Sequence, residues 1–247
     1  MTKSVKDNIR IPPFETADLR SNLSRYLDAL FLDPSGQMVK VGNYKWGVYA
    51  FFDYDGEPIY VGQTNEMLRT RIRRHLTNQR TDAVAMSVLD PFEVSEIEVW
   101  PLPQFQNTSG KSKDGKYKDA KIYLNALERQ ITRKAIDDSN FKAILNEKDP
   151  PPSELTVEVP CSYRASIVSD RVKEIRSHPD FRIARRALIS SRLAQVISER
   201  EVKGGLRRVL LTQAKRLQWL AERRYVGLGG AATVEVKKED EQEDDGD

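Results

Sequence analysis

The chain has 247 residues, of which 31% are charged, and its formal net charge is only +3. Its one cysteine, Cys161, excludes an internal disulfide, and neither His75 nor His178 stands at a spacing from it that is familiar from zinc sites. Without a long apolar run or a signal-peptide pattern after Met1, membrane insertion and secretion are disfavoured, and we expect a cytoplasmic protein in a reducing compartment.

The first half of the chain alternates between helical and strand patterns. Residues 14–31 carry apolar side chains at helical spacing, which predicts an amphipathic helix that covers the core or pairs with another subunit. Residues 48–52 and 58–61 are rich in β-formers and flank an Asp-Gly turn signal, so they predict a β-hairpin. From Glu66 onward, apolar residues recur at the spacing of a short helix whose remaining surface is basic.

The middle of the chain predicts one more strand and one more helix. Residues 92–100 alternate imperfectly between apolar and acidic side chains, which is consistent with a third strand beside the hairpin. Residues 120–136 place apolar side chains at helical spacing, with Glu128 at the border of that apolar side. Three prolines within residues 149–153 indicate a domain boundary.

The last part of the chain is strongly segregated in charge. Residues 164–224 read mostly as helix and hold sixteen Lys/Arg against six Asp/Glu. Such an excess is typical of a phosphate-contacting surface, but a solvated helical bundle or a dimerisation arm would leave the same pattern. Residues 235–247 hold eight acidic residues and two lysines with almost nothing apolar, which predicts a disordered tail.

Two tripeptides in the hairpin and the helix after them carry the most specific pattern. Gly47-Val48-Tyr49 and Tyr60-Val61-Gly62 set two tyrosines on neighbouring strands, and Arg71 and His75 share one face of the following helix. These motifs, in this order and at this spacing, resemble the GIY-YIG nuclease superfamily. The Arg-x-x-x-His pair looks like its restriction-endonuclease branch, since repair-type members commonly have Tyr where His75 stands.

The resemblance implies a fold and further site residues. The fold would be α/β of the α+β type, with a small, mainly antiparallel three-stranded sheet flanked by helices and, here, a mainly helical basic C-terminal region. The family's metal-binding glutamate would be Glu128, and its asparagine would be Asn146, with Asn140 as the alternative. Gln63 stands where many relatives have Lys, which excludes a cationic role there.

The same residues offer the chemistry that phosphodiester hydrolysis needs. Tyr49 is assigned to proton handling together with His75. A free phenol with a pKa near ~10 is a poor base, so this role requires a neighbouring cation or metal that lowers the pKa of Tyr49. Tyr60 would position these groups, and the planar Arg71 guanidinium would contact the phosphate. Glu128 would hold one Mg²⁺ or Mn²⁺, with waters and the substrate phosphate completing its shell.

Together these patterns predict an endonuclease for double-stranded DNA of the restriction or defence type, and by resemblance it would leave 5′-phosphate and 3′-hydroxyl ends. A repair, recombination or mobile-element nicking enzyme, or a non-catalytic DNA-binding protein that keeps the fold, stays open. With one site per chain, cutting both strands would require a homodimer or successive nicks. DNA contacts are expected from Gln63, Arg69, Arg73 and Arg74.

We expect four segments along the chain: a helical extension (1–40), the nuclease domain (41–150), a basic helical region (151–228) and a disordered acidic tail (229–247).

Overall fold

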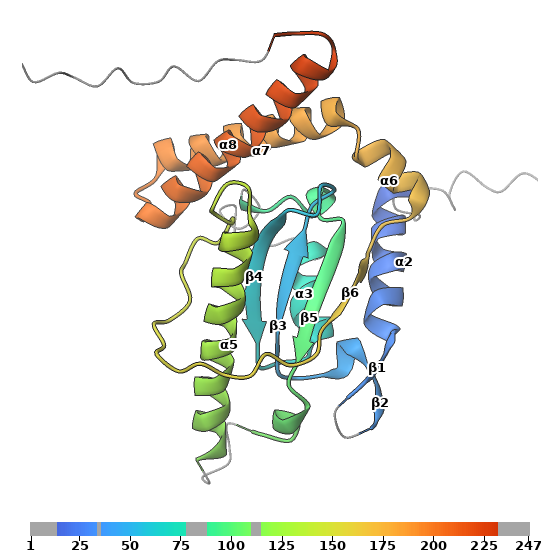
Figure 1. The fold of residues 1–247 in the computed structure, drawn as a ribbon, viewed down its shortest axis with the longest axis vertical. Coiled ribbons are helices and arrows are strands. Elements are labelled where there is room, and N and C mark those ends of the chain that lie inside the picture. Colours follow the sequence, from blue (N-terminus) through green and yellow to red (C-terminus); the bar gives the residue numbers. More distant parts are fainter. Residues whose placement is uncertain (1–13, 34–35, 78–87, 110–114, 232–247) are drawn as a thin grey trace, which may run out of the picture.

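A four-stranded antiparallel sheet forms the centre of the computed structural model, which describes residues 14–33, 36–77, 88–109 and 115–231 (Figure 1). The strands lie in the order β4-β3-β5-β6. Their bounds are β3 (Gly47–Phe52), β4 (Pro58–Thr64), β5 (Glu96–Pro101) and β6 (Tyr163–Ser166). A separate two-stranded sheet joins β1 (Leu30–Leu32) to β2 (Met38–Lys40).

The sheet differs from the predicted one in its number of strands. Three strands were expected, and the fourth, β6, pairs with β5 from within the basic C-terminal region. Its four residues, Tyr-Arg-Ala-Ser, are too short and too polar to give a strand signal. The strand expected over residues 92–100 starts only at Glu96, because Pro91–Glu93 form a 3-10 turn capped by Asp90, whose side chain accepts a hydrogen bond from the Phe92 amide.

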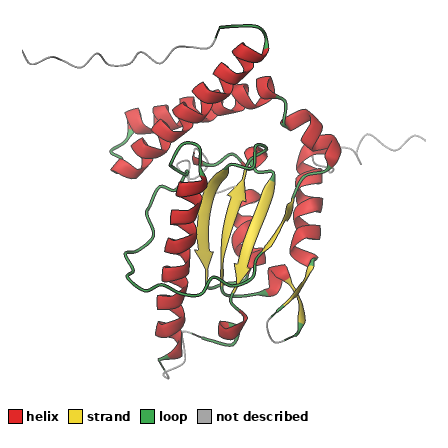
Figure 2. Cartoon of the chain, in the orientation of Figure 1, coloured by secondary structure: helices red, strands yellow, loops and turns green. Residues whose placement is uncertain are grey.

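Helices cover both faces of the sheet and one of its ends (Figures 1 and 2). The long α5 lies against one face of β3 and β4, and α2 and α3 lie on the other. The paired helices α7 and α8 cross the end of the sheet where the β3–β4 turn lies. Their bounds are α2 (Phe14–Asp28), α3 (Leu68–Leu76), α5 (Lys116–Asp138), α6 (Asp170–Arg176), α7 (Pro179–Glu199) and α8 (Gly204–Gly227).

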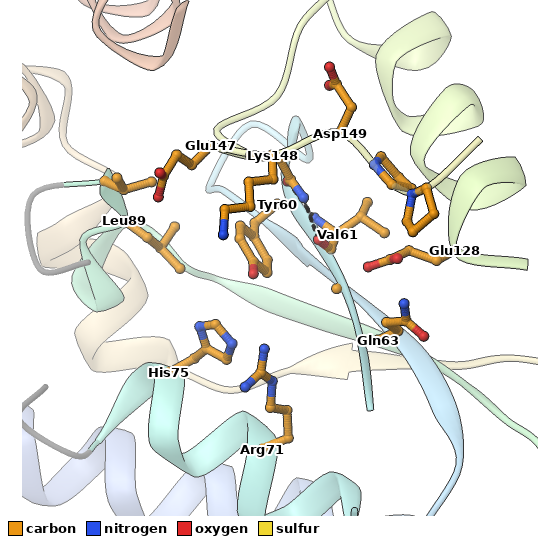
Figure 3. A pocket seen from close by; sticks show the side chains of 15 residues that line it. Tyr60, Val61, Gln63, Arg71, His75, Leu89, Glu128, Glu147, Lys148 and Asp149 are labelled. Atoms are coloured by element: carbon orange, nitrogen blue, oxygen red, sulfur yellow. Dashed lines mark hydrogen bonds between the residues drawn. The ribbon is translucent and has the colours of Figure 1, made fainter. Parts of the chain in front are cut away.

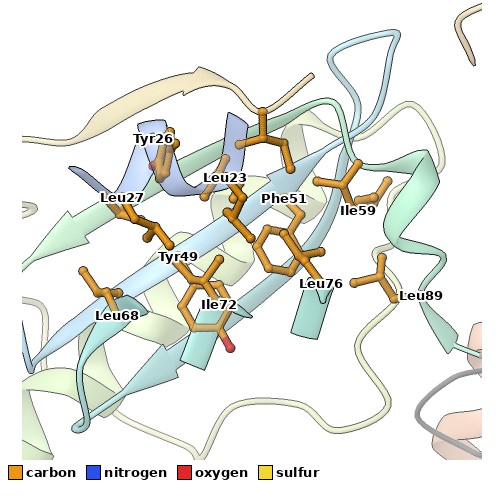
Figure 4. Close-up of a cluster of buried hydrophobic side chains, with 14 of the residues drawn as sticks. Leu23, Tyr26, Leu27, Tyr49, Phe51, Ile59, Leu68, Ile72, Leu76 and Leu89 are labelled. Atoms are coloured by element: carbon orange, nitrogen blue, oxygen red, sulfur yellow. The ribbon is translucent and has the colours of Figure 1, made fainter. Parts of the chain in front are cut away.

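The central strand β3 is buried along its whole length because both of its faces are covered. Its side chains alternate between the two layers. Tyr49 and Phe51 pack with the leucines and isoleucines of α2 and α3 (Figure 4), whereas Val48 and Ala50 pack against α5. No helix in the described part of the chain is long and apolar enough to cross a membrane.

Glycine is required at position 62 by the register of the hairpin. Gly62 lies directly opposite Tyr49 in the β3–β4 pair. A Cβ at this position would lie only 2.6 Å from the Tyr49 hydroxyl and 3.0 Å from the Tyr60 ring. The absence of a side chain at Gly62 therefore lets both tyrosine rings lie over the strand on the α3 side.

A buried ion cluster fastens α7 and α8 to the hairpin turn. The Asp53 carboxylate accepts hydrogen bonds from Arg182 at 3.1 Å, Arg186 at 2.9 Å and Arg216 at 2.7 Å. Arg186 also donates to Glu93 at 2.9 Å, and all five side chains are buried. These three arginines of the basic region therefore neutralise internal carboxylates and are not available to a nucleic acid.

The remaining parts of the predicted chain organisation lie partly outside the described residues. The first thirteen residues of the N-terminal extension and the acidic tail from residue 232 onward belong to this group. Within the extension, α2 ends at Asp28, before the expected end of the helix, and Phe31 belongs to β1.

Replacing the central carboxylate tests the ion cluster. We expect Asp53→Asn to lower the free energy of unfolding by about 3 to 5 kcal/mol, because it leaves three buried guanidinium groups without their shared anion. Urea denaturation measures this change. Asp138→Asn, which removes an exposed partner of Lys134, is the matched control and should cost less than about 1 kcal/mol. Equal stability of the two variants would contradict the assigned role of Asp53.

Candidate active site

A cavity of about 510 Å³ opens along the free edge of β4 (Figure 3). Because β4 is the outer strand, helices on opposite faces of the sheet can both reach past it. One wall is α3, with Arg71 and His75, and the opposite wall is α5, with Glu128. Residues 146–151 form a third wall, and β4 itself contributes Tyr60 and residues 61–63. Groups far apart in the sequence therefore share one space.

Tyr49 lies beneath this cavity and joins its two α3 residues. The Tyr49 hydroxyl lies 2.9 Å from His75 Nε2 and accepts a hydrogen bond from Arg71 Nε at 3.2 Å. Burial raises the pKa of the phenol well above its ordinary value, and nearby Tyr60 adds to the rise while Arg71 opposes it. Tyr49 therefore keeps its proton near neutral pH and orients its two neighbours.

Tyr60 occupies a different position from Tyr49. It lines the cavity, and its hydroxyl points toward Arg71 and His75 (Figure 3). Its ring stacks on Tyr49 with centroids 6.3 Å apart and lies 5.2 Å from the His75 ring. Of the two tyrosines, Tyr60 is thus the one that a molecule in the cavity would meet.

Glu128 faces the cavity from α5, across from Arg71 (Figure 3). Its side chain is nearly buried, and this desolvation raises the pKa of the carboxyl to about 7. A hydrogen bond from Gln63 and the more distant charges of Lys121 and Arg71 only partly oppose that rise. Within the described residues, Glu128 forms no ion pair at contact distance.

This environment fits a divalent cation held by one protein carboxylate. The described residues contain no group of three His, Cys, Asp or Glu side chains that could enclose a metal ion. Mg²⁺ commonly binds through one or two carboxylates and keeps waters and substrate phosphates as its other ligands. A desolvated carboxylate beside an open cavity meets that requirement, because a bound cation would offset the cost of ionising it.

The two candidate asparagines lie in different places. Asn146 lines the cavity, but both polar atoms of its side chain bind the Val61 backbone: Oδ1 accepts from the amide at 3.1 Å and Nδ2 donates to the carbonyl at 2.7 Å. The Asn140 side chain instead donates to the carboxylate of buried Glu57, the residue just before β4. Asn146 therefore fixes the free edge of β4, whereas Asn140 is not among the described residues that line the cavity.

Of the residues expected to contact DNA, only Gln63 lines the cavity, and it donates to Asn125 at 2.8 Å. Arg69 binds Asp28 at 2.7 Å, and Arg73 donates to Ser24 on α2 at 3.0 Å. Arg74 pairs with Glu66 at 2.7 Å and remains partly exposed. These three arginines are engaged within the protein on the surface around α3.

Of the third wall, sequence reasoning predicted Asn146 and missed residues 147–151. Residues 147–151 follow Asn146 directly, and the side chain of Lys148 points into the cavity from there (Figure 3). The only available signal was proximity to the predicted asparagine, because the proline-rich stretch that follows reads as a linker.

Comparison with known proteins identifies one family in the segment that contains the hairpin. Residues 45–108 match the family model described as the GIY-YIG catalytic domain. Searches of curated proteins and of solved structures gave no match. The matched segment includes Tyr49, Tyr60, Arg71 and His75, whereas Glu128 and Asn146 lie beyond it.

Desolvation of Glu128 predicts that this residue destabilises the metal-free fold. Because the pKa is about 7 in the folded protein against an ordinary 4.5, stability is lost as the pH rises between these values. We expect Glu128→Gln to raise the free energy of unfolding at pH 8 by up to about 3 kcal/mol, with no gain well below pH 4.5.

Urea denaturation in a chelator at the two pH values measures this difference. Glu174→Gln, an exposed change on α6, is the control and should be neutral at both. A Glu128→Gln variant no more stable than the wild type at pH 8 would contradict the desolvation of this carboxyl.

Proposed function

We propose that this protein is a metal-dependent endonuclease that hydrolyses double-stranded DNA, because its residues 45–108 match the GIY-YIG catalytic domain. The observation that carries this proposal is that Arg71 and Glu128 line opposite walls of one cavity at the edge of β4. A cation for the phosphate and a carboxylate for a metal then face each other over a space with room for a nucleic-acid strand.

Arg71 is assigned to the scissile phosphate. Its Nε donates a hydrogen bond to the Tyr49 hydroxyl, which fixes the guanidinium plane. Its terminal nitrogens point into the cavity (Figure 3). Two parallel hydrogen bonds from the terminal nitrogens to non-bridging oxygens would stabilise the charge that grows on the phosphate. Tyr49 is thus a positioning residue for Arg71.

His75 is assigned to the proton of the attacking water. It lines the cavity next to Arg71, and its Nε2 lies 2.9 Å from the Tyr49 hydroxyl. We assign Nε2–H as the donor to the Tyr49 oxygen, so that Nδ1 would take up the proton of the water. Histidine is the side chain best suited to take up a proton near neutral pH. Because burial keeps Tyr49 protonated, we assign the proton transfer to His75 and the orientation of the water to the cavity-facing Tyr60 hydroxyl.

Glu128 would hold Mg²⁺ or Mn²⁺, and such an ion would stabilise the oxygen that leaves the phosphorus. The products in this scheme are a 5′-phosphate and a 3′-hydroxyl end. A restriction or defence role is favoured by the resemblance of the Arg71 and His75 pair on α3 to the restriction-endonuclease branch of the family. A second candidate, a DNA-binding protein without catalysis, is disfavoured by Glu128, since binding alone does not require a desolvated carboxylate.

Conversion of supercoiled plasmid in Mg²⁺ separates these two candidates. We expect wild-type protein to nick or linearise the plasmid, and Arg71→Ala and Glu128→Gln each to lower the rate at least about a hundredfold while DNA binding is retained. Arg133→Ala, on the exposed surface of α5, is the control and should cut normally. Wild-type protein that binds a broad set of DNA sequences without cutting any would favour the non-catalytic candidate.

The pKa of Glu128 sets an expected link between pH and metal. Because its carboxyl is protonated below about pH 7, the metal affinity should fall about tenfold for each further unit of pH. At limiting Mg²⁺ the cleavage rate should follow the same slope, and excess Mg²⁺ should move the acid limb to lower pH. Cleavage rates measured across pH at two Mg²⁺ concentrations test this, and an acid limb that does not move with Mg²⁺ would exclude Glu128 as its source.

A further inference from the structure

Lys148 is a second cation in the cavity, on a different wall from Arg71. Its side chain extends from the 146–151 segment toward the space above His75 and Tyr60 (Figure 3). The side chain is exposed, and within the described residues its ammonium group forms no ion pair. On α3, Arg69 and Arg74 pair with protein carboxylates, whereas the Lys148 ammonium stays available to a ligand.

The residues on both sides of Lys148 are held by contacts with other parts of the chain. On its N-terminal side, Leu145 donates to the Ile59 carbonyl at 2.8 Å, and Asn146 binds Val61 through both of its polar atoms. On its C-terminal side, Asp149 receives two hydrogen bonds of 2.9 Å from Arg208 of α8. Lys148 therefore projects from a segment held at both ends.

The first turn of α8 packs directly on this segment. A Cβ at Gly205 would lie 1.9 Å from the Glu147 carbonyl oxygen, so only glycine permits this approach. Arg208 also reaches the Asn146 carbonyl at 3.4 Å. The C-terminal helical region thus shapes one wall of the cavity, although its own cluster of arginines lies buried elsewhere.

We propose that Lys148 binds a backbone phosphate of the DNA strand in the cavity, and that Arg208 is the positioning residue that holds Lys148 there through Asp149. This inference rests on the proposed nuclease function. Lys148 and Arg71 lie on different walls of one cavity, so a polyanionic strand that passes between them would contact a cation on each side. A lysine suits this task, because an ammonium on a flexible stem can follow a phosphate whose position varies with DNA sequence.

The salt dependence of DNA binding tests Lys148 without requiring cleavage. Binding is measured with a duplex in Ca²⁺, at several salt concentrations, for wild type, Lys148→Ala, Lys148→Arg and the control Lys173→Ala on α6. The loss of one phosphate contact should lower the slope of log affinity against log salt by about 0.9. We expect this change in Lys148→Ala only, with recovery in Lys148→Arg. A wild-type slope in Lys148→Ala would overturn the proposal.

A double-mutant cycle tests the positioning by Arg208. In cleavage assays, Lys148→Ala should raise KM about tenfold with little change in kcat, and Arg208→Ala should do the same to a smaller extent. In the Lys148→Ala background, Arg208→Ala should add little, because its effect passes through Lys148. Additive effects would show that Arg208 acts independently and would overturn its assigned role.

The outcomes separate this inference from the function on which it rests. Wild-type protein that binds DNA but never cuts would end the proposed catalysis, while the salt slope would still decide whether Lys148 contacts phosphate. Wild-type protein that cuts DNA, with Lys148→Ala unchanged in KM and in salt slope, would end the inference alone. Wild-type protein that binds no DNA would overturn both.

Discussion

The candidate site depends on the position of β4 at the outer edge of its sheet. A strand inside the sheet would have a neighbour on each side, and helices packed on opposite faces could not bring side chains together past it. At the edge, Arg71 from one face and Glu128 from the other reach the same space. An open edge also exposes unpaired backbone groups that invite pairing with another strand. Asn146 meets that need by binding both backbone groups of Val61, and the same contact places the third wall.

Burial divides the polar groups of the site into two layers. Tyr49 lies in the core, where desolvation keeps its proton in place and its hydroxyl can serve only as a fixed hydrogen-bonding partner. Tyr60, Arg71 and His75 lie one layer further out and face the cavity. The two tyrosines of the paired tripeptides therefore have unequal environments, although the sequence presents them almost symmetrically. Gly62 makes this layering possible, since any side chain there would displace the Tyr49 ring.

Local periodicity predicted the elements nearest the cavity, and the fold class is confirmed apart from one strand. The hairpin and α3 follow from alternating and helical spacing over a few residues, which is information that a single sequence carries. The β6 strand could not be found in this way, because its short polar sequence becomes a strand only through pairing with β5. The burial of arginines in the C-terminal region could not be predicted either. Nothing in the neighbouring sequence distinguishes Arg182, which is buried against Asp53, from an arginine in solvent. The roles of Glu128 and Asn146 came from family resemblance and stay predictions, although both residues line the cavity.

The ion cluster around Asp53 limits any attempt to isolate the segment that matches the family model. The segment that carries the family motifs ends well before α7 and α8, yet its hairpin turn holds an acidic group whose counter-charges all arrive from those two helices. A fragment trimmed at the prolines near residue 150 would leave that acid without partners in the core and would strip β6 from the sheet. Moving the candidate site into a fusion protein therefore requires the chain at least to the end of α8. In this chain, the part that must fold together is considerably longer than the segment that matches the family model.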